Sequence, residues 1–341
     1  MDRLALYRRL PYPLKVLTAS LRGWHLDRWR YGADLEHRVA EIHEREHWDS
    51  EAWERWRDTR LADLLRRAID APAYARAWAD RPGDPTRLAD WPVLQKPALR
   101  ADPTGYLVSG TDPRKLYPEH TSGSTGTPLR LWWGRDTVRG WYALVEARLR
   151  RWHGIDRRDR WAILGGQLVT DVRRTRPPFW VWNAGMRQLY LSAYHLSPSN
   201  ARAQLDALHR HRVRYLLGYP SALHALASAL LDQQLDGAGL GLRVVITNAE
   251  PLYPHQRLAI GKAFDCPVRE TYGMAELVAG ASECDAGRLH LWPEVGAIEI
   301  GDRSELIATG LLNHHQPLIR YRVGDRLVLA DESTRCSCGR T

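Results

Sequence analysis

Short apolar runs that alternate with helical stretches constrain the fold of this chain more than any other feature of its sequence. The runs RWAILGG, VRYLLGYP and LRVVITNAE end in or run into Gly, Pro or Asn, and a helical pattern follows each. Parallel strands need a long crossover connection, usually a helix, so this alternation predicts a largely parallel sheet. We therefore expect an α/β fold with mainly parallel sheets flanked by helices.

The two ends of the chain depart from this alternation. Residues 1–75 read as helical, with apolar positions three and four residues apart in ERWRDTRLADLLRRAI. Near the C-terminus, GAIEI, SELIATG and RLVLADE read as shorter strands joined by turns. The sequence therefore predicts a helical N-terminal region over residues 1–75 and an α/β core over residues 76–341, with a small β subdomain at about 284–341.

Charge and hydropathy limit the partners. The net charge is +9, but its arginines are spread along the chain, and no basic cluster is interleaved with aromatic residues as in single-strand binders. We expect no nucleic-acid partner. The Arg, Leu and Trp content of the N-terminal helix would suit an anionic membrane surface, but we expect that helix to pack on the core. The chain has no apolar run of spanning length and no signal-peptide pattern, so we expect a cytoplasmic protein.

The stretch HTSGSTGTPLR, from His120 to Arg130, is the most informative part of the sequence. Glycine allows close approach of the backbone to a ligand, and successive N–H groups with hydroxyl donors form a nest suited to phosphates. No GKS or GKT triplet closes the loop, so it is not a Walker-type loop. A polar surface turn has the same composition and stays open as an alternative. The candidate phosphate-binding residues are Thr121, Ser122, Gly123, Ser124, Thr125 and Gly126.

The order of residues in this loop resembles a known signature. TSGSTGTP is similar to the SSGTTGKP-type loop of the adenylate-forming superfamily, with Thr127 where many members have lysine. TNAEPLYP, RETYGMAE and PLIRYRVGD follow in the expected order and resemble motifs of the phenylacetate–CoA ligase-like branch. With PVLQKPALR and LLGYPSAL these matches extend over nearly the whole chain. The closest resemblance is to members of that branch linked with capsular polysaccharide biosynthesis.

The resemblance implies a role for each matching residue. Thr125 and Glu276 are the candidate catalytic residues, with Thr125 on the phosphates and Glu276 as an oxygen ligand of Mg²⁺. Tyr272 is expected to stack on adenine, and Asp325 to accept both ribose hydroxyls. The adenine- and ribose-binding set is Ala249, Glu250, Glu270, Thr271, Tyr272, Gly273 and Asp325.

Cysteine and histidine residues suggest a second metal. Cys284 with His290, and Cys336 with Cys338, are two close-spaced pairs that could form a tetrahedral Cys₃His site. The C-x-C spacing is tighter than the usual C-x-x-C, and reduced thiols with a packed histidine are the alternative. Some members of the resembling branch carry such residues as a structural zinc site, which favours zinc.

Together these features predict ATP-dependent activation of a carboxylic acid as an acyl-adenylate, followed by transfer to coenzyme A, a carrier-protein thiol or an amine. Members of the superfamily usually continue into a small mobile domain that carries a catalytic lysine. This sequence ends at CGRT and its last lysine is Lys262, so we expect that domain to be missing from it. The alternative function is therefore a weakly active or silent protein that binds a nucleotide or a carboxylate.

Overall fold

The computed structural model describes residue 7 and residues 10–121, 128–330 and 336–340. This part of the chain forms two compact units. The first unit draws on residues 1–32, 146–271 and 283–289, and the second on the residues between and after them. The predicted domain boundaries near residues 75 and 284 stay predictions.

Parallel strands form the centre of the first unit. They lie in the order β8-β7-β6-β3-β5-β4, with parallel pairing from β8 to β5 and antiparallel pairing of β5 with β4 at the edge. The expected mainly parallel α/β sheet is thereby confirmed. The strands are β3 (Trp161–Gly165), β4 (Trp180–Asn183), β5 (Gln188–Ser192), β6 (Tyr215–Gly218), β7 (Val244–Thr247) and β8 (Val268–Gly273).

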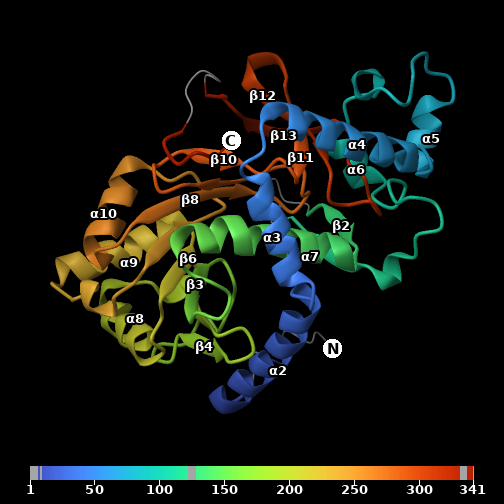
Figure 1. The fold of residues 1–341 in the computed structure, drawn as a ribbon. Helices are drawn as coiled ribbons and strands as arrows, with labels where there is room; N and C mark the ends of the chain where they lie inside the picture. The colour runs from blue at the N-terminus through green and yellow to red at the C-terminus, as the bar shows by residue number, and fades with distance from the viewer. Residues whose placement is uncertain (1–6, 8–9, 122–127, 331–335, 341) are drawn as a thin grey trace. The chain divides into compact units, whose positions relative to one another are not determined.

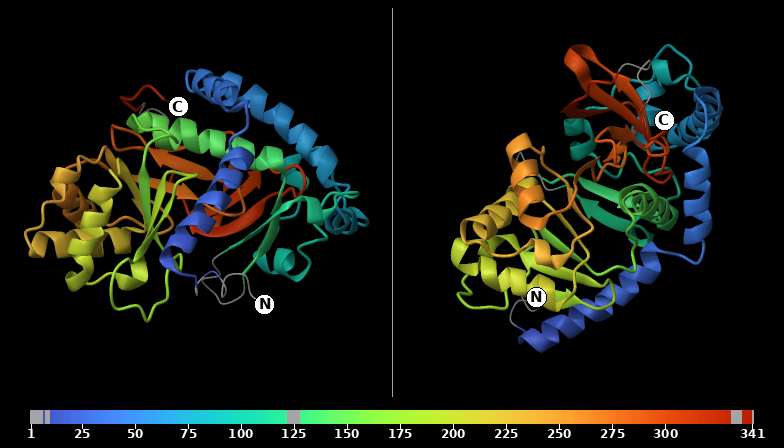
Figure 2. Two further views of the ribbon diagram at one scale, coloured as in Figure 1. Left: turned by 90° about the horizontal axis from the view of Figure 1, so that it is seen from below. Right: turned by 60° about the vertical axis from the view of Figure 1, so that its left-hand side comes forward.

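Three helices connect the parallel strands and pack on one face of the sheet (Figures 1 and 2). Each begins with a proline in its first turn, where the missing N–H costs nothing and the fixed φ suits a helix. The helices are α8 (Pro198–Arg210), α9 (Pro220–Asp232) and α10 (Pro254–Phe264).

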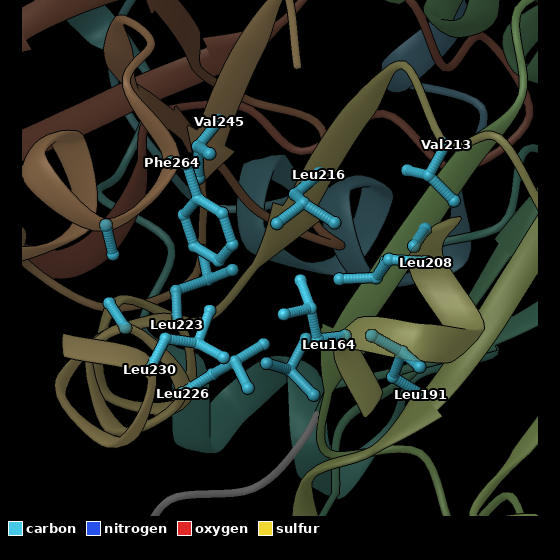
Figure 3. Packing of buried hydrophobic residues seen from close by; sticks show 14 of the residues in the cluster. Leu164, Leu191, Leu208, Val213, Leu216, Leu223, Leu226, Leu230, Val245 and Phe264 are labelled. Carbon is cyan, nitrogen blue, oxygen red and sulfur yellow. The ribbon is translucent and has the colours of Figure 1, made fainter. Parts of the chain in front are cut away.

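The core of the first unit lies between these helices and the sheet (Figure 3). Alternate side chains of a strand point to opposite faces, so Leu164, Leu216 and Val245 face the helices while Trp161 and Ile246 pack on the other face. Both faces are covered by apolar residues, which explains why these strands read as continuous apolar runs.

The N-terminal helix α2 (Tyr12–Arg30) packs on the edge strand β4. The Ser20 hydroxyl accepts a hydrogen bond from the backbone N–H of Ala184 at 3.0 Å. At Gly23 a β-carbon would lie 1.9 Å from Asn183 Oδ1, so this close approach requires glycine. The expected packing of this helix on the core is therefore observed on one of its faces.

The second unit contains the remaining α-helices of the described residues. The helices expected within residues 1–75 are present, and the last of them ends at Trp78, just past this range. A 3₁₀ turn at Leu88–Asp90 and another at Pro113–Lys115 connect them to the strands. The helices are α3 (Leu35–Arg45), α4 (Ser50–Ala68), α5 (Pro72–Trp78), α6 (Lys96–Ala101) and α7 (Arg135–Leu144). Among the described residues, none of the helices combines the length and the apolar character needed to cross a membrane.

Two sets of antiparallel strands lie in the second unit. Strand β1 pairs with β2, and β12 lies between β11 and β13. The runs GAIEI and SELIATG form strands as expected, but the last strand ends at Arg326, the first residue of RLVLADE. Residues 321–326 already complete the pairing with β12, and Val328 and Leu329 are left exposed. The strands are β1 (Tyr117–His120), β2 (Arg130–Trp133), β9 (Gly280–Glu283), β10 (Leu289–Leu291), β11 (Gly296–Ile300), β12 (Glu305–Gly310) and β13 (Tyr321–Arg326).

Candidate functional site

The predicted phosphate loop is the connection between β1 and β2. Its stem is closed by two hydrogen bonds, from the Thr121 N–H to the Leu129 carbonyl at 3.1 Å and from the Leu129 N–H to the Thr121 hydroxyl oxygen at 3.0 Å. A hydroxyl that accepts one hydrogen bond still has a proton to donate. The remaining loop candidates, Ser122, Gly123, Ser124, Thr125 and Gly126, lie outside the described residues.

Two motifs that are far apart in the sequence meet in the second unit. Leu94, from PVLQKPALR, forms a parallel bridge with Tyr321, from PLIRYRVGD. The Leu94 N–H donates to the Arg320 carbonyl and the Arg322 N–H to the Leu94 carbonyl, both at 3.0 Å. This bridge fixes the start of α6, whose first residue is Lys96.

The predicted magnesium ligand Glu276 lies at this junction. Its side chain is buried, and its Oε1 accepts a hydrogen bond from the Tyr321 hydroxyl at 3.0 Å and lies 3.3 Å from Lys96 Nζ. Burial, together with the adjacent charge of Glu276, raises the pKa of Tyr321, so this hydroxyl stays protonated and donates. A buried carboxylate held in this way presents a fixed, charged oxygen ligand.

The expected nucleoside-binding residues Tyr272 and Asp325 also lie together. The Tyr272 hydroxyl donates to Asp325 Oδ2 at 2.6 Å, a length typical of a strong hydrogen bond to a carboxylate. Burial is the largest cause that raises the pKa of Tyr272, followed by its bond to Asp325. At Gly273 a β-carbon would lie 3.2 Å from the Trp141 ring, so glycine leaves room for that ring. An aromatic ring thus lies beside a carboxylate that can accept hydrogen bonds from hydroxyl groups.

In the first unit, the segment after β7 carries two more candidates. Ala249 adopts a left-handed backbone conformation with φ of 65°, which is uncommon for a residue other than glycine. The Glu250 carboxylate accepts the Ser221 N–H at 3.1 Å, in the first turn of α9, where a negative charge is favourable. This segment therefore turns sharply at the carboxyl end of a parallel strand, where α/β folds bind ligands.

Strand β8 carries Glu270 and Thr271. Glu270 Oε1 accepts the Leu252 N–H at 3.4 Å, and burial raises the pKa of Glu270. The Thr271 hydroxyl donates to the carbonyl of Thr247 on the neighbouring strand at 2.8 Å. Both side chains are thereby tied to the segment that follows β7.

An ion pair that the sequence did not predict supports Glu270. Arg257 of α10 binds Glu283 through both of its terminal nitrogens, at 2.9 and 2.8 Å, and the Glu270 N–H donates to the same carboxylate at 2.8 Å. Glu283 is buried, so its charge needs these partners. Neither Arg257 nor Glu283 lies in one of the sequence motifs that resemble the family's nucleotide-binding signatures. Lys96 and Tyr321 do lie inside such motifs, and a residue-by-residue comparison could have found them.

Cysteine and histidine side chains gather at another place in the second unit. The ligand atoms of His290, Cys336 and Cys338 lie within 4.8 Å of one another, with Cys338 Sγ 3.3 Å from His290 Nε2. Cys284 belongs to the first unit, six residues before His290 along the chain. It is buried and begins a tight turn in which its N–H donates to the Arg288 carbonyl at 2.8 Å. Thiolates with an imidazole are a donor set that fits zinc.

Each unit therefore collects a share of the predicted residues. The first unit holds Ala249, Glu250, Glu270 and Thr271, and the second holds Tyr272, Gly273, Glu276 and Asp325.

Comparison with known proteins finds relatives in two groups. The chain is 29% identical over 222 residues to Protein CapK of Staphylococcus aureus, a match that covers 64% of this chain and 49% of CapK. It is 26% identical to phenylacetate-coenzyme A ligase of Pseudomonas putida, with 78% of this chain and 64% of that protein covered. The expected resemblance to the phenylacetate–CoA ligase-like branch is thus confirmed. The chain spans about half to two thirds of the length of these two relatives.

Solved structures agree on the fold. An open conformation of 2-hydroxyisobutyryl-CoA ligase, in complex with 2-HIB-AMP and CoA, matches with a TM-score of 0.66 at 20% identity, covering 87% of this chain and 74% of that chain. The family model described as AMP-binding enzyme matches residues 115–303, more than half of the sequence. The chain therefore belongs to the family of AMP-binding enzymes.

Proposed function

We propose that this chain binds ATP and Mg²⁺ and activates a carboxylic acid as an acyl-adenylate, with onward transfer to a thiol or an amine. The observation that carries the proposal is the 2.6 Å hydrogen bond between Tyr272 and Asp325. It holds a ring that can stack on a base beside a carboxylate that can accept ribose hydroxyls. A nucleoside offers a base to such a ring and ribose hydroxyls to such a carboxylate. Membership of the AMP-binding enzymes supports the same reading.

The candidate nucleoside-binding residues would divide the contacts to the base and the ribose among them. Tyr272 would stack on adenine, Glu270 would accept from its amino group, and the backbone at Ala249 and Glu250 would line the base. Thr271 and Gly273 flank the tyrosine: the Thr271 hydroxyl is bonded to the Thr247 carbonyl, and Gly273 leaves room for the Trp141 ring. Asp325 has lone pairs enough to accept ribose hydroxyls while keeping its bond to Tyr272.

The phosphates would lie against the loop of Thr121 to Gly126, with Thr125 as a hydroxyl donor. Glu276 fits Mg²⁺ because it offers a hard, buried oxygen ligand, and proteins usually bind this ion through one or two carboxylates and the substrate's phosphates. When bound, the ion would offset negative charge on the phosphates. Lys96, beside Glu276, adds a positive charge at the same place.

The chemistry would proceed in two steps. A carboxylate oxygen of the acid attacks the α-phosphorus of ATP, a C–O–P linkage forms, and the bond to the bridging oxygen breaks so that pyrophosphate leaves. The sulfur of coenzyme A or of a carrier-protein thiol, or an amine nitrogen, then attacks the acyl carbon. AMP leaves with the bonding electrons, and the acceptor's proton passes to solvent. The contribution of the protein is orientation and charge stabilisation.

Calorimetric titration with ATP and Mg²⁺ tests the nucleotide site. Base–aromatic stacking contributes about 1–3 kcal/mol, so Tyr272→Ala should weaken binding by about fivefold to a hundredfold. Tyr272→Phe keeps the ring and should bind far better than the alanine variant, and Glu276→Ala should weaken the Mg²⁺-dependent part. Tyr253→Phe, at an exposed tyrosine, is the matched control. Equal affinity of wild type and Tyr272→Ala would contradict the proposed site.

Isotope exchange between pyrophosphate and ATP tests the reaction. A panel of aryl and alkyl carboxylic acids should contain at least one that stimulates exchange, and the stimulating acid identifies the substrate class. The stimulated exchange should fall in the Glu276→Ala and Asp325→Asn variants. ATP binding without exchange for any acid would favour the alternative, a protein that binds a nucleotide without turnover.

We propose that Cys284, His290, Cys336 and Cys338 hold a structural zinc ion, since four protein ligands leave no open position. The cluster of His290 with the two C-terminal cysteines supports this, as does the short chain distance to buried Cys284. Elemental analysis of the purified chain should find about one zinc per molecule, and Cys338→Ser should lower it. Cys266→Ser is the control, because burial raises the pKa of Cys266 to about 12 and disfavours the thiolate. Full zinc content in Cys338→Ser would contradict the site.

We propose a cytoplasmic location, where ATP and reduced thiols are available, and small-molecule partners in place of nucleic acid. Cell fractionation followed by immunodetection tests the location. An electrophoretic mobility shift with mixed-sequence DNA and RNA tests the second point, and binding that weakens with salt would contradict it.

A further inference from the structure

Helix α2 has two faces of different character. The inward face, with Ser20 and Gly23, packs on β4 and the turn after it. At Gly185, in that turn, a β-carbon would lie 2.2 Å from the backbone nitrogen of Trp24, so helix and turn are in close contact. The position of the helix, and therefore of its opposite face, is set by the first unit itself.

The outward face of α2 carries an apolar stripe. Leu14, Leu17, Leu21 and Trp24 are 46–54% exposed and follow one another at intervals of three, four and three residues. At 100° per residue this spacing places all four on one side of the helix. Single exposed apolar residues are ordinary, but four in a row on one helix face mark a surface that contacts another apolar phase.

Exposed arginines accompany this stripe. Helix α2 contains four Lys and Arg and one Asp, a net charge of +3, with Lys15 buried on its inward face. Arg28 continues the stripe one turn beyond Trp24, and Arg22 lies at its flank, and both are exposed. The outward face of α2 is therefore both apolar and positively charged.

Two hollows of the first unit are lined in part by α2. The first, of about 340 Å³, is lined by Trp24, Arg157, Arg158 and Arg187, with Asp27 as its one acidic residue. The second, of about 530 Å³ and mainly apolar, has Arg22 in its lining. Both therefore combine arginine with the edge of an apolar surface. Arginine binds phosphate through parallel N–H bonds, and a lipid headgroup presents phosphate beside an apolar phase.

We propose that the outward face of α2 is a docking surface for a bilayer that contains anionic phospholipids. The three leucines enter the boundary of the acyl chains, Trp24 lies at the level of the headgroups, and the arginines bind headgroup phosphates. A second copy of the chain is disfavoured as the occupant, because pairing two such faces would bring two sets of positive charge together. The proposal does not rest on the enzymatic function, and its test needs no activity.

Flotation of the full chain with lipid vesicles tests the proposal. Vesicles of phosphatidylcholine with phosphatidylglycerol should carry the protein upward, pure phosphatidylcholine vesicles should carry much less, and added salt should release it. Arg22→Gln and Arg28→Gln should each weaken binding about fivefold, from the roughly 1 kcal/mol that one basic residue contributes near an anionic surface. Leu17→Glu with Leu21→Glu should abolish binding.

Leu258→Glu is the matched control, since Leu258 is an exposed leucine on α10, outside this face. It should bind vesicles like the wild type, and all variants should keep the wild-type circular dichroism spectrum and melting midpoint. Equal flotation with neutral and anionic vesicles, or unchanged flotation of the double glutamate variant, would overturn the proposal. So would a dimer in sedimentation velocity that the double variant dissociates, if no vesicle binding accompanies it.

Discussion

The hydrogen bond from Tyr321 to Glu276 allows a quantitative test of the junction that holds the predicted magnesium ligand. Tyr321→Phe removes only the hydroxyl, which donates to a buried carboxylate at 3.0 Å, and leaves the ring that packs in the core. A hydrogen bond to a charged group contributes about 1.5–3 kcal/mol, so we expect a loss of about 2 kcal/mol in the free energy of unfolding. For a unit of this size, that corresponds to a midpoint lowered by about 4–8 °C.

Differential scanning calorimetry measures this change, and a double-mutant cycle assigns it to the pair. In a Glu276→Gln background the acceptor is neutral, and Tyr321→Phe should then cost only about 1 kcal/mol. Tyr194→Phe is the control, because its hydroxyl bonds to the Gly166 carbonyl at an exposed position, and it should change stability by less than about 0.5 kcal/mol. The reasoning is refuted if Tyr321→Phe costs the same in both backgrounds, or if it leaves the midpoint unchanged.

Three further predictions concern the first unit. Leu226→Ala, in the fully packed core of α9, should cost about 3 kcal/mol in denaturant unfolding, and a loss below about 1 kcal/mol would contradict the packing described. Gly185→Ala should cost about 1–3 kcal/mol, since its β-carbon would meet the backbone of α2 at 2.2 Å, and an unchanged midpoint would mean that the contact is loose. Burial, with the nearby arginines, lowers the pKa of His211 below its ordinary 6.5, so protonation favours the unfolded chain. Its contribution to stability is therefore present above pH 6.5 and is lost as the pH falls from that value through the lower pKa of the folded chain. The His211→Gln variant should lose less stability than the wild type as the pH falls below 6.5.

Much of the fold could be predicted because its signals are local. The runs ending at Gly165, Gly218 and Thr247 read as strands, and each is one, because strand periodicity and the turn residues that follow are properties of neighbouring positions. The same reasoning failed for RLVLADE. Its composition suits a strand, but a strand also needs a partner. Residues 321–326 already occupy the edge of β12.

The candidate site shows the same division. Motif order named Tyr272, Glu276 and Asp325, because each lies in a short signature that can be compared along the chain. The hydrogen bond between Tyr272 and Asp325 could not be predicted, since it joins β8 to the end of β13 across more than fifty residues. Nor could the ion pair of Lys96 with Glu276, which depends on a bridge between two distant segments.

The sequence by itself determined the α/β class, the family and most of the candidate residues, because periodicity and motif order are carried by residues close together in the chain. Only the tertiary structure decided which charges are buried and paired, as for Glu276 and Glu283, and which apolar residues stay exposed, as on the outward face of α2. The physical reason is that burial depends on which distant segments cover a side chain. An apolar residue that faces a neighbour and one that faces solvent have the same local pattern.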